Sequence, residues 1–175
     1  MIRENTPERK IGQKACSRVW FPCTVCVGAL PRPEDYMNPS SDMLRSLLQS
    51  VCTIAVIGAK DTPTQPVDGV GRYLLQSGFA VIPVHPVRTG VWGLTTYASV
   101  RDIPAPVDIV VAFRAPQYCP GHAREVLGMK HRPVAFWMQL GIRSSEAASL
   151  MEDAGIVVVQ DICLKQEHCR LFPRP

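Results

Sequence analysis

The sequence lacks any apolar run near the roughly 20 residues that a membrane-spanning helix needs, which argues against an integral membrane protein. The sequence also lacks a large excess of charge of either sign, since 19 basic and 15 acidic side chains leave a net charge of only +4. This small, scattered surplus does not indicate a nucleic-acid binder. Charged residues make up 19% of the chain and hydrophobic residues 46%, a composition typical of a folded domain.

The cysteine pattern gives no sign of a disulfide framework. The chain has seven cysteines, an odd number, and four of them stand singly in hydrophobic contexts. A reducing cytoplasm is therefore the expected location. Cys23 and Cys26 follow Cys16, but no fourth metal ligand and no strand–helix unit accompany them. We therefore expect neither a zinc site nor a redox motif there.

The chain divides near residue 40. Residues 1–39 are rich in proline and glycine, show no sustained periodicity and do not resemble a signal peptide. We expect this segment to be a disordered or adventitious leader, and residues 40–175 to form one domain. A body of this size buries about two-thirds of its unfolded surface, so it needs neither a disulfide nor a metal to fold.

Short apolar runs alternate with amphipathic stretches throughout residues 40–175. The runs predict five strands, at 53–57, 79–84, 107–113, 134–138 and 156–159. Continuous apolar runs are typical of strands covered on both faces, and their alternation with helices is typical of βαβ units. We therefore expect an α/β fold, a doubly wound, Rossmann-like, five-stranded parallel sheet with strand order 3-2-1-4-5.

Ligands in such sheets bind beyond the carboxyl ends of the strands, where the winding reverses direction. With this strand order the crevice lies between the first and fourth strands. Three loops are then expected to line it, at residues 58–64, 85–90 and 139–143.

The loop after the first strand has the makings of an anion site. Backbone N–H groups at a strand-to-helix turn can bind a phosphate, and the turn consists of Gly58, Ala59, Lys60, Asp61 and Thr62. A plain turn, in which the glycine only allows close packing, is an equally good interpretation. The loop does not match G-x-G-x-x-G, and the second strand ends on a histidine instead of a ribose-binding carboxylate, which disfavours NAD. The chain also lacks the P-loop of an NTPase.

The other strand ends add further candidates. After the second strand, Arg88 is suited to a phosphate, although a solvated loop cation is an equally good interpretation. His85 and Pro86 precede Arg88 in the same loop. After the third strand, Phe113 could stack on a heterocycle and Arg114 could bind a phosphate. After the fourth strand, Gln139 and Gly141 would let the backbone approach a ligand closely.

Several of these motifs together resemble a known family. The sequence contains, in order, V-I-G-A with prolines four and seven residues later, V-H-P, Y-A-S-V-R-D-I-P-x-P-V-D-I-V, F-R-x-P, W-M-Q-L-G-I and D-I-C-L-K-x-E-H. This order is similar to that of the small bacterial CoA-binding domain proteins, which are themselves similar to the nucleotide-binding lobe of the succinyl-CoA synthetase α subunit. The resemblance covers about residues 44–171 and implies a Rossmann-like fold with coenzyme A as ligand.

The resemblance also implies where CoA binds. The family's phosphate-binding turn falls on residues 58–62, and its other binding loops fall on 84–88, 113–116 and 139–141. The sequence departs from the family pattern at Lys60, His85 and Gln65, where the family has a small residue, an asparagine and a basic residue. The phosphohistidine domain of the synthetase subunit has no counterpart here, so the resemblance does not imply ligase activity.

These observations predict a stand-alone protein that binds CoA or an acyl-CoA, as a sensor or a carrier, without catalytic machinery. The alternatives are an acyl-CoA-using enzyme, a ligase lobe that acts with a partner subunit, and a scaffold whose nucleotide site has decayed. The enzyme hypothesis uses Cys163 as nucleophile and His168 as base. The competing interpretation is a structural cluster in which Asp161 caps the last helix and the histidine is hydrogen-bonded. A homo-oligomer and a complex with another protein both stay open.

Overall fold

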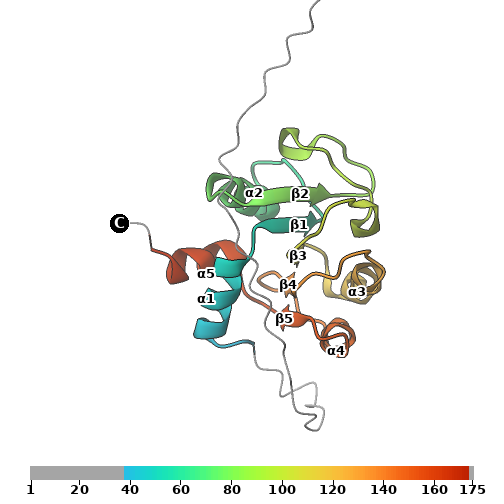
Figure 1. Cartoon of the computed structure of the whole chain (residues 1–175). Coiled ribbons are helices and arrows are strands. Elements are labelled where there is room, and N and C mark those ends of the chain that lie inside the picture. The colour runs from blue at the N-terminus through green and yellow to red at the C-terminus, as the bar shows by residue number, and fades with distance from the viewer. Residues whose placement is uncertain (1–37, 174–175) are drawn as a thin grey trace, which may run out of the picture.

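The computed structural model describes residues 38–173, so the predicted leader lies almost entirely outside the described residues. It is a three-layer α/β structure with one parallel sheet between two layers of helices (Figure 1). The five strands are β1 (Thr53–Ile57), β2 (Ala80–Val84), β3 (Ile109–Ala112), β4 (Ala135–Met138) and β5 (Val157–Val159). All five pair in parallel, as the apolar runs predicted. The α/β class and the Rossmann-like architecture are therefore confirmed.

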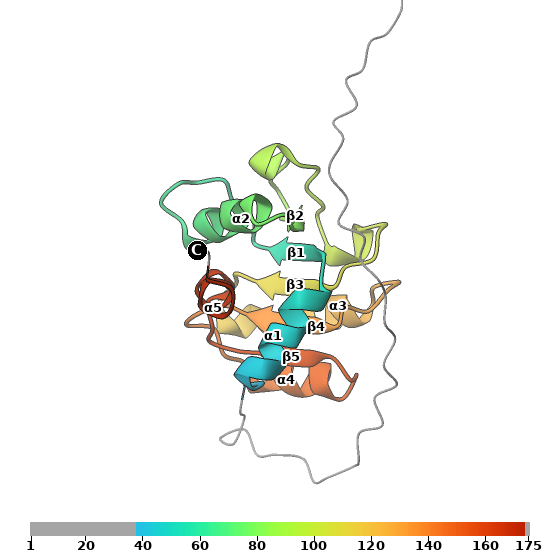
Figure 2. The same cartoon turned by 60° about the vertical axis from the view of Figure 1, so that its left-hand side comes forward.

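Helices cover both faces of the sheet. One face carries α1 (Ser41–Ser50), α2 (Pro66–Gln76) and α5 (Leu164–Leu171), and the other carries α3 (Cys119–Leu127) and α4 (Ser145–Glu152). In Figure 2, α1, α2 and α5 lie on the near side of the sheet, and α3 and α4 lie behind it. Because both faces are covered, the strands need apolar side chains in both directions, and β3 and β4 are buried at every position.

The predicted strand order 3-2-1-4-5 is wrong. The order is β2-β1-β3-β4-β5, so β3 pairs with β1 and β4 in the middle of the sheet and β2 forms an edge. Proline 83 gives the physical reason. Pro83 has no N–H to donate, and its carbonyl accepts a bond from the Tyr97 N–H on the outer side of β2. A strand with a proline suits an edge but not an interior position between two partners.

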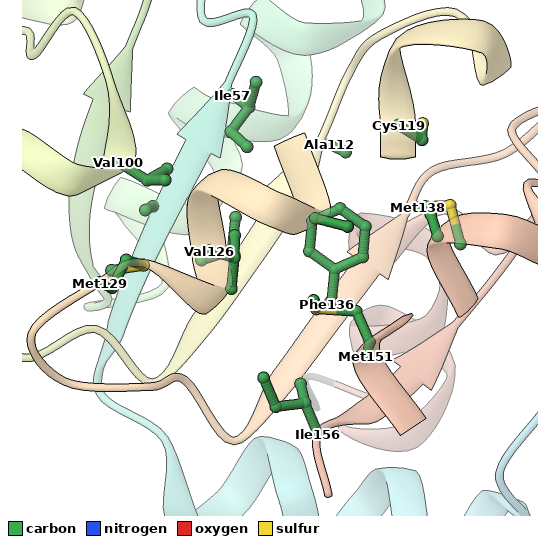
Figure 3. Packing of buried hydrophobic residues seen from close by; sticks show 14 of the residues in the cluster. Ile57, Val100, Ala112, Cys119, Val126, Met129, Phe136, Met138, Met151 and Ile156 are labelled. Carbon is green, nitrogen blue, oxygen red and sulfur yellow. The ribbon is translucent and has the colours of Figure 1, made fainter. Parts of the chain in front are cut away.

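The core divides into two apolar clusters, one on each face of the sheet. Figure 3 shows the cluster under α3 and α4, in which Phe136 of β4 packs among Val126, Met151 and Ile156. On the other face, Trp137 is fully buried and donates from its Nε1 to the carbonyl of Ile162, at 2.7 Å. That bond fixes the chain just before α5 begins.

The connection from β2 to β3 contains short 3₁₀ turns, at Val91–Gly93 and Val100–Asp102. Its Trp92 packs against α2, where a Cβ added to Gly71 would lie 2.2 Å from the indole ring. The Trp92 Nε1 donates to the buried carboxylate of Asp68, whose two oxygens also share the Nε–H of Arg72. These contacts hold the connection against the α2 side of the sheet.

Candidate functional site

A cleft of about 540 Å³ opens at the carboxyl ends of β1, β3 and β4. The first turn of α2 and the start of α5 complete its walls. Because β3 lies beside β1, the winding reverses between these two strands, and the crevice lies there and not between the first and fourth strands as predicted. The loops after β1, β3 and β4 line it, whereas none of residues 85–90 does.

Half of the twelve predicted binding residues line this cleft. These six are Gly58, Lys60, Phe113, Arg114, Gln139 and Gly141. They come from three separate strand ends, so the fold brings together residues that are up to 83 positions apart in the sequence. The contact of each with a ligand stays a prediction.

Gly58 sets the path of the loop after β1. Its φ is +80°, a conformation that favours glycine, and an added Cβ would lie 2.6 Å from the Phe113 carbonyl oxygen. Its N–H donates to the carbonyl of Val84 in β2, at 2.9 Å. The loop therefore passes tightly over the end of β3 before it turns into the cleft.

Arg114 stands two residues after the end of β3 and lines the cleft. The Nε atom is buried without a hydrogen-bond partner, and the guanidinium lies 5.5 Å from the centre of the Tyr118 ring. An unpaired buried donor costs free energy, and a donor on a charged group costs more. Arg114 therefore brings an unpaired donor to the residues that line the cleft.

Gln139, at the end of β4, has a similar unpaired donor. Only 3% of the residue is exposed, and its Oε1 accepts the N–H of Leu164 at 3.3 Å. The amide nitrogen Nε2 is buried and has no partner. Since the bond from Leu164 fixes which atom is the acceptor, the cleft gains a second donor from this side chain.

His85 and Arg88 lie beside the cleft and do not line it. The His85 Nδ1 accepts the N–H groups of Val87 and Arg88, both at 3.1 Å. Burial lowers the pKa of His85, and the charges of Arg88, Lys60 and Arg114 lower it further. Its ring is therefore neutral at neutral pH and holds the loop in shape. Arg88 pairs with Asp61 at 3.2 Å.

The remaining predicted residues of this group also lie outside the lining. Ala59 is fully buried, and its N–H donates to the Val84 carbonyl. Thr62 lies in the loop before α2, where its carbonyl accepts the N–H of Gln65. Pro86 is exposed on the loop after β2. The strand-order error explains part of this outcome, because it placed the loop after β2 at the crevice.

Asp161 braces the loop after β4. Its carboxylate accepts the Gly141 N–H at 2.6 Å and the Arg143 Nε at 3.0 Å. These bonds lower the pKa of Asp161, first through Gly141 and then through Arg143. The N-cap of α5 is Cys163, without a side-chain cap bond. The expectation that Asp161 caps α5 is therefore wrong.

Asp161→Asn is expected to lower stability at neutral pH, since the neutral amide cannot form the ion pair with Arg143. The folded-state pKa of Asp161 is below its usual 3.8, so the carboxylate stabilises the fold above that value and loses this effect as the pH falls through the lower, folded-state pKa. Asparagine tolerates the φ of +57° at this position. Urea unfolding of both proteins across the acid range checks this, and a stability difference that is independent of pH would contradict it.

Cys163 and His168, the nucleophile and base of the enzyme hypothesis, have different surroundings in the structure. Cys163 lines the cleft, whereas the His168 Nδ1 lies 2.7 Å from the Tyr73 hydroxyl and its ring packs against Phe79 and Phe172. His168 thus anchors α5 to α2, as the structural interpretation expects.

Sequence reasoning missed the part of the lining that the helices contribute. Val67 and Val70 lie three residues apart on α2. Leu140 and Ile142 belong to the loop 139–143, which was expected to line the crevice, although neither was named as a binding residue. Cys163 and Gln166 have the same helical spacing at the start of α5. Residues three apart share a helix face, so the spacing was a usable signal, but only the tertiary structure shows which face meets the cleft. Gln65 and Pro66 were not predicted either, whereas Ala115 and Pro116 belong to the loop 113–116 that the resemblance implied.

Two further findings concern residues 38–173. Within this range, no group of three or more metal-ligating side chains is placed to hold an ion. None of the helices described there has the length and apolar character to cross a membrane. The cysteines Cys16, Cys23 and Cys26 lie outside the described residues.

The model of the CoA binding domain family matches residues 52–169, about two-thirds of the chain. The chain belongs to this family. The match begins just before β1 and ends within α5, so it covers the whole sheet and every wall of the cleft. The resemblance stated from the motifs is thereby confirmed.

Relatives of this CoA-binding domain protein include shorter chains that match it over almost their whole length. It is 34% identical to the protein YneT of Bacillus subtilis (strain 168) over 131 residues, which cover 75% of this chain and 96% of the relative. The solved structure of cell-free ID.343 from Thermus thermophilus is 41% identical, with a TM-score of 0.72, and the match covers 77% of this chain and all of that one.

A larger protein contains the same fold as one part. The dinucleotide-forming acetyl-coenzyme A synthetase 1 of Ca. Korarchaeum cryptofilum matches 63% of this chain with 26% of its own, at 23% identity and a TM-score of 0.53. This similarity shows the shared fold of one synthetase lobe.

Proposed function

We propose that this protein binds CoA or an acyl-CoA as a stand-alone module, as a carrier or a sensor, in the cleft at the ends of β1, β3 and β4. The observation that carries the proposal is the pair of buried, unpartnered donors, Arg114 Nε and Gln139 Nε2, in one cleft. A cleft that keeps two such donors is built for a ligand with several acceptors. The phosphates and amides of CoA supply them.

The cleft also has the charge that a phosphate requires. Lys60 and Arg114 line it, and α2 begins at its wall with Gln65 and Pro66. The first N–H groups of a helix have no acceptor within the helix, and the helix dipole favours negative charge at that end. The pantetheine arm of CoA requires an apolar surface as well. Val67 and Val70 of α2, together with Leu140 and Ile142, provide one.

The four cysteines in the described part of the chain are all free thiols. This supports the proposal that the protein works in the reducing cytoplasm.

The second candidate function is an enzyme that acts on an acyl-CoA, alone or as a ligase lobe with a partner subunit. The position of Cys163 in the cleft favours it, and the shared fold with a synthetase lobe is compatible with it. Thioester turnover that disappears in Cys163→Ala would support this function over simple binding. The bond between His168 and Tyr73 weighs against His168 as the base.

CoA is expected to raise the unfolding temperature of the protein, whereas NAD and ATP are not. A ligand at one hundred times its dissociation constant stabilises the folded state by about 2.7 kcal/mol. Thermal unfolding with each nucleotide, together with mass spectrometry of any nucleotide that co-purifies, tests the proposal. Stabilisation by NAD without any by CoA would overturn it, and the absence of stabilisation by every nucleotide would favour a scaffold with a decayed site.

A further inference from the structure

A thiol lies in the wall of the proposed CoA cleft. Cys163 is half-buried, lines the cleft, and is the N-cap of α5. Gln166, one turn further along α5, lines the same wall. Of the four cysteines at residues 38–173, Cys163 alone faces the cleft.

The buried amide of Gln139 is an independent observation that points to a ligand group beside this thiol. Gln139 is 97% buried, and the backbone N–H that its Oε1 accepts is that of Leu164, the residue after the cysteine. The Nε2 of the same amide has no partner. A carbonyl acceptor placed there by a ligand would remove this cost, and the pantetheine arm of CoA carries two amide carbonyls.

The positions of the cationic side chains in the cleft indicate the direction of such an arm. Lys60 lies at the β1 end and Arg114 at the end of β3, whereas Cys163 lies with the β4 loop at the far end. Strands β1 and β4 are two positions apart in the sheet, a separation of about 10 Å. Phosphates at the cationic end therefore place the thiol-bearing arm toward Cys163.

We propose that Cys163 forms a reversible mixed disulfide with the coenzyme in this cleft, by exchange with a CoA disulfide. This inference rests on the proposed function. The Cys163 thiolate attacks one sulfur of the CoA disulfide, so the coenzyme S–S bond breaks and a Cys163–S–S–CoA bond forms. The second CoA leaves as a thiolate and takes up the proton that Cys163 lost. One disulfide is consumed and one is made, so no further oxidant is needed.

Cys119 and Cys169 have surroundings that differ from those of Cys163, and neither lines the cleft. Cys119 is fully buried, and burial raises the pKa of its thiol to about 11. Cys169 is exposed, and its Sγ donates to the Tyr73 hydroxyl at 3.2 Å. Cys163 instead lines the cleft as the N-cap of α5, without a side-chain bond to the helix.

The experiment compares two disulfides on the full chain. The reduced protein is incubated with CoA disulfide or with glutathione disulfide, then alkylated and digested with trypsin. Cleavage after Arg143, Lys165 and Arg170 puts Cys163 on the peptide 144–165 and Cys169 on the peptide 166–170, so each site is followed separately. We expect the CoA adduct on peptide 144–165 to form at least about tenfold faster than the glutathione adduct, because binding orients the reacting sulfurs. Dithiothreitol should remove it.

Two variants test whether the cleft directs the exchange. Arg114→Ala should bring the rate with CoA disulfide down toward the glutathione rate, and Cys169→Ser should leave the adduct on peptide 144–165 unchanged. Equal rates with the two disulfides, or faster modification of peptide 166–170, would overturn the inference. If reduced CoA raises the unfolding temperature but peptide 144–165 stays unmodified, the inference fails and the proposed function stands. If reduced CoA has no such effect, both fail.

Discussion

Arg114→Ala is expected to weaken CoA binding by about ten- to a hundredfold. Its guanidinium reaches the cleft from the end of β3 with a buried, unpaired Nε, and a hydrogen bond to a charged group contributes about 1.5 to 3 kcal/mol. Lys60→Ala should also weaken binding, since Lys60 lines the same cleft. Both effects should be larger at low salt, because part of the attraction is screened. Calorimetric titration of each variant measures them.

Two other arginines serve as comparisons for this loss of affinity. Arg124 lies on α3 and pairs with Glu146 of α4, so Arg124→Ala should bind CoA like the wild type. Arg88 lies beside the cleft and pairs with Asp61, and we expect a smaller loss from Arg88→Ala than from Arg114→Ala. Titration with dephospho-CoA, which lacks the 3′-phosphate, then identifies the residue that binds this phosphate. Substitution of that residue should no longer change the affinity for the ligand. A loss in Arg124→Ala with normal binding in Arg114→Ala would move the site away from this edge of the sheet.

Gly58→Ala is expected to destabilise the protein by about 2 to 5 kcal/mol and to reduce CoA affinity. The φ of +80° strains any residue with a Cβ, and here the Cβ would also lie 2.6 Å from the Phe113 carbonyl oxygen. Neither atom is the end of a flexible side chain, so the loop or the end of β3 must move. Urea unfolding gives the stability, and calorimetry gives the affinity.

Two other glycines distinguish the effect of backbone strain from that of the close contact with the Phe113 carbonyl. Gly78 has a φ of +88° with nothing within 4 Å of the added Cβ, so Gly78→Ala should cost only the backbone strain, about 1 to 2 kcal/mol. Gly121 lies in α3 with open space around its Cβ position, and Gly121→Ala should stabilise the helix by about 0.5 to 1 kcal/mol. Equal losses in Gly58→Ala and Gly78→Ala would show that the contact with Phe113 contributes nothing.

Part of the candidate site was predictable because strand ends are local features. Lys60, Arg114 and Gln139 each follow an apolar run, and parallel strands bring their carboxyl ends to one edge. His85 and Arg88 follow an apolar run in the same way, yet they lie outside the cleft lining. The difference depends on which strands are neighbours, which the apolar runs do not encode.

The sequence by itself determined the elements, the parallel sheet and the family. Apolar runs and the glycines that follow them act over a few residues, so they can be interpreted without the fold. The tertiary structure decided the strand order, and with it the cleft between β1 and β3. Pro83 was the one local sign of that order, since a strand lacking an N–H suits an edge. Only packing shows that Cys163 and Gln139 share a wall, because that proximity depends on α5 returning across the sheet to α2.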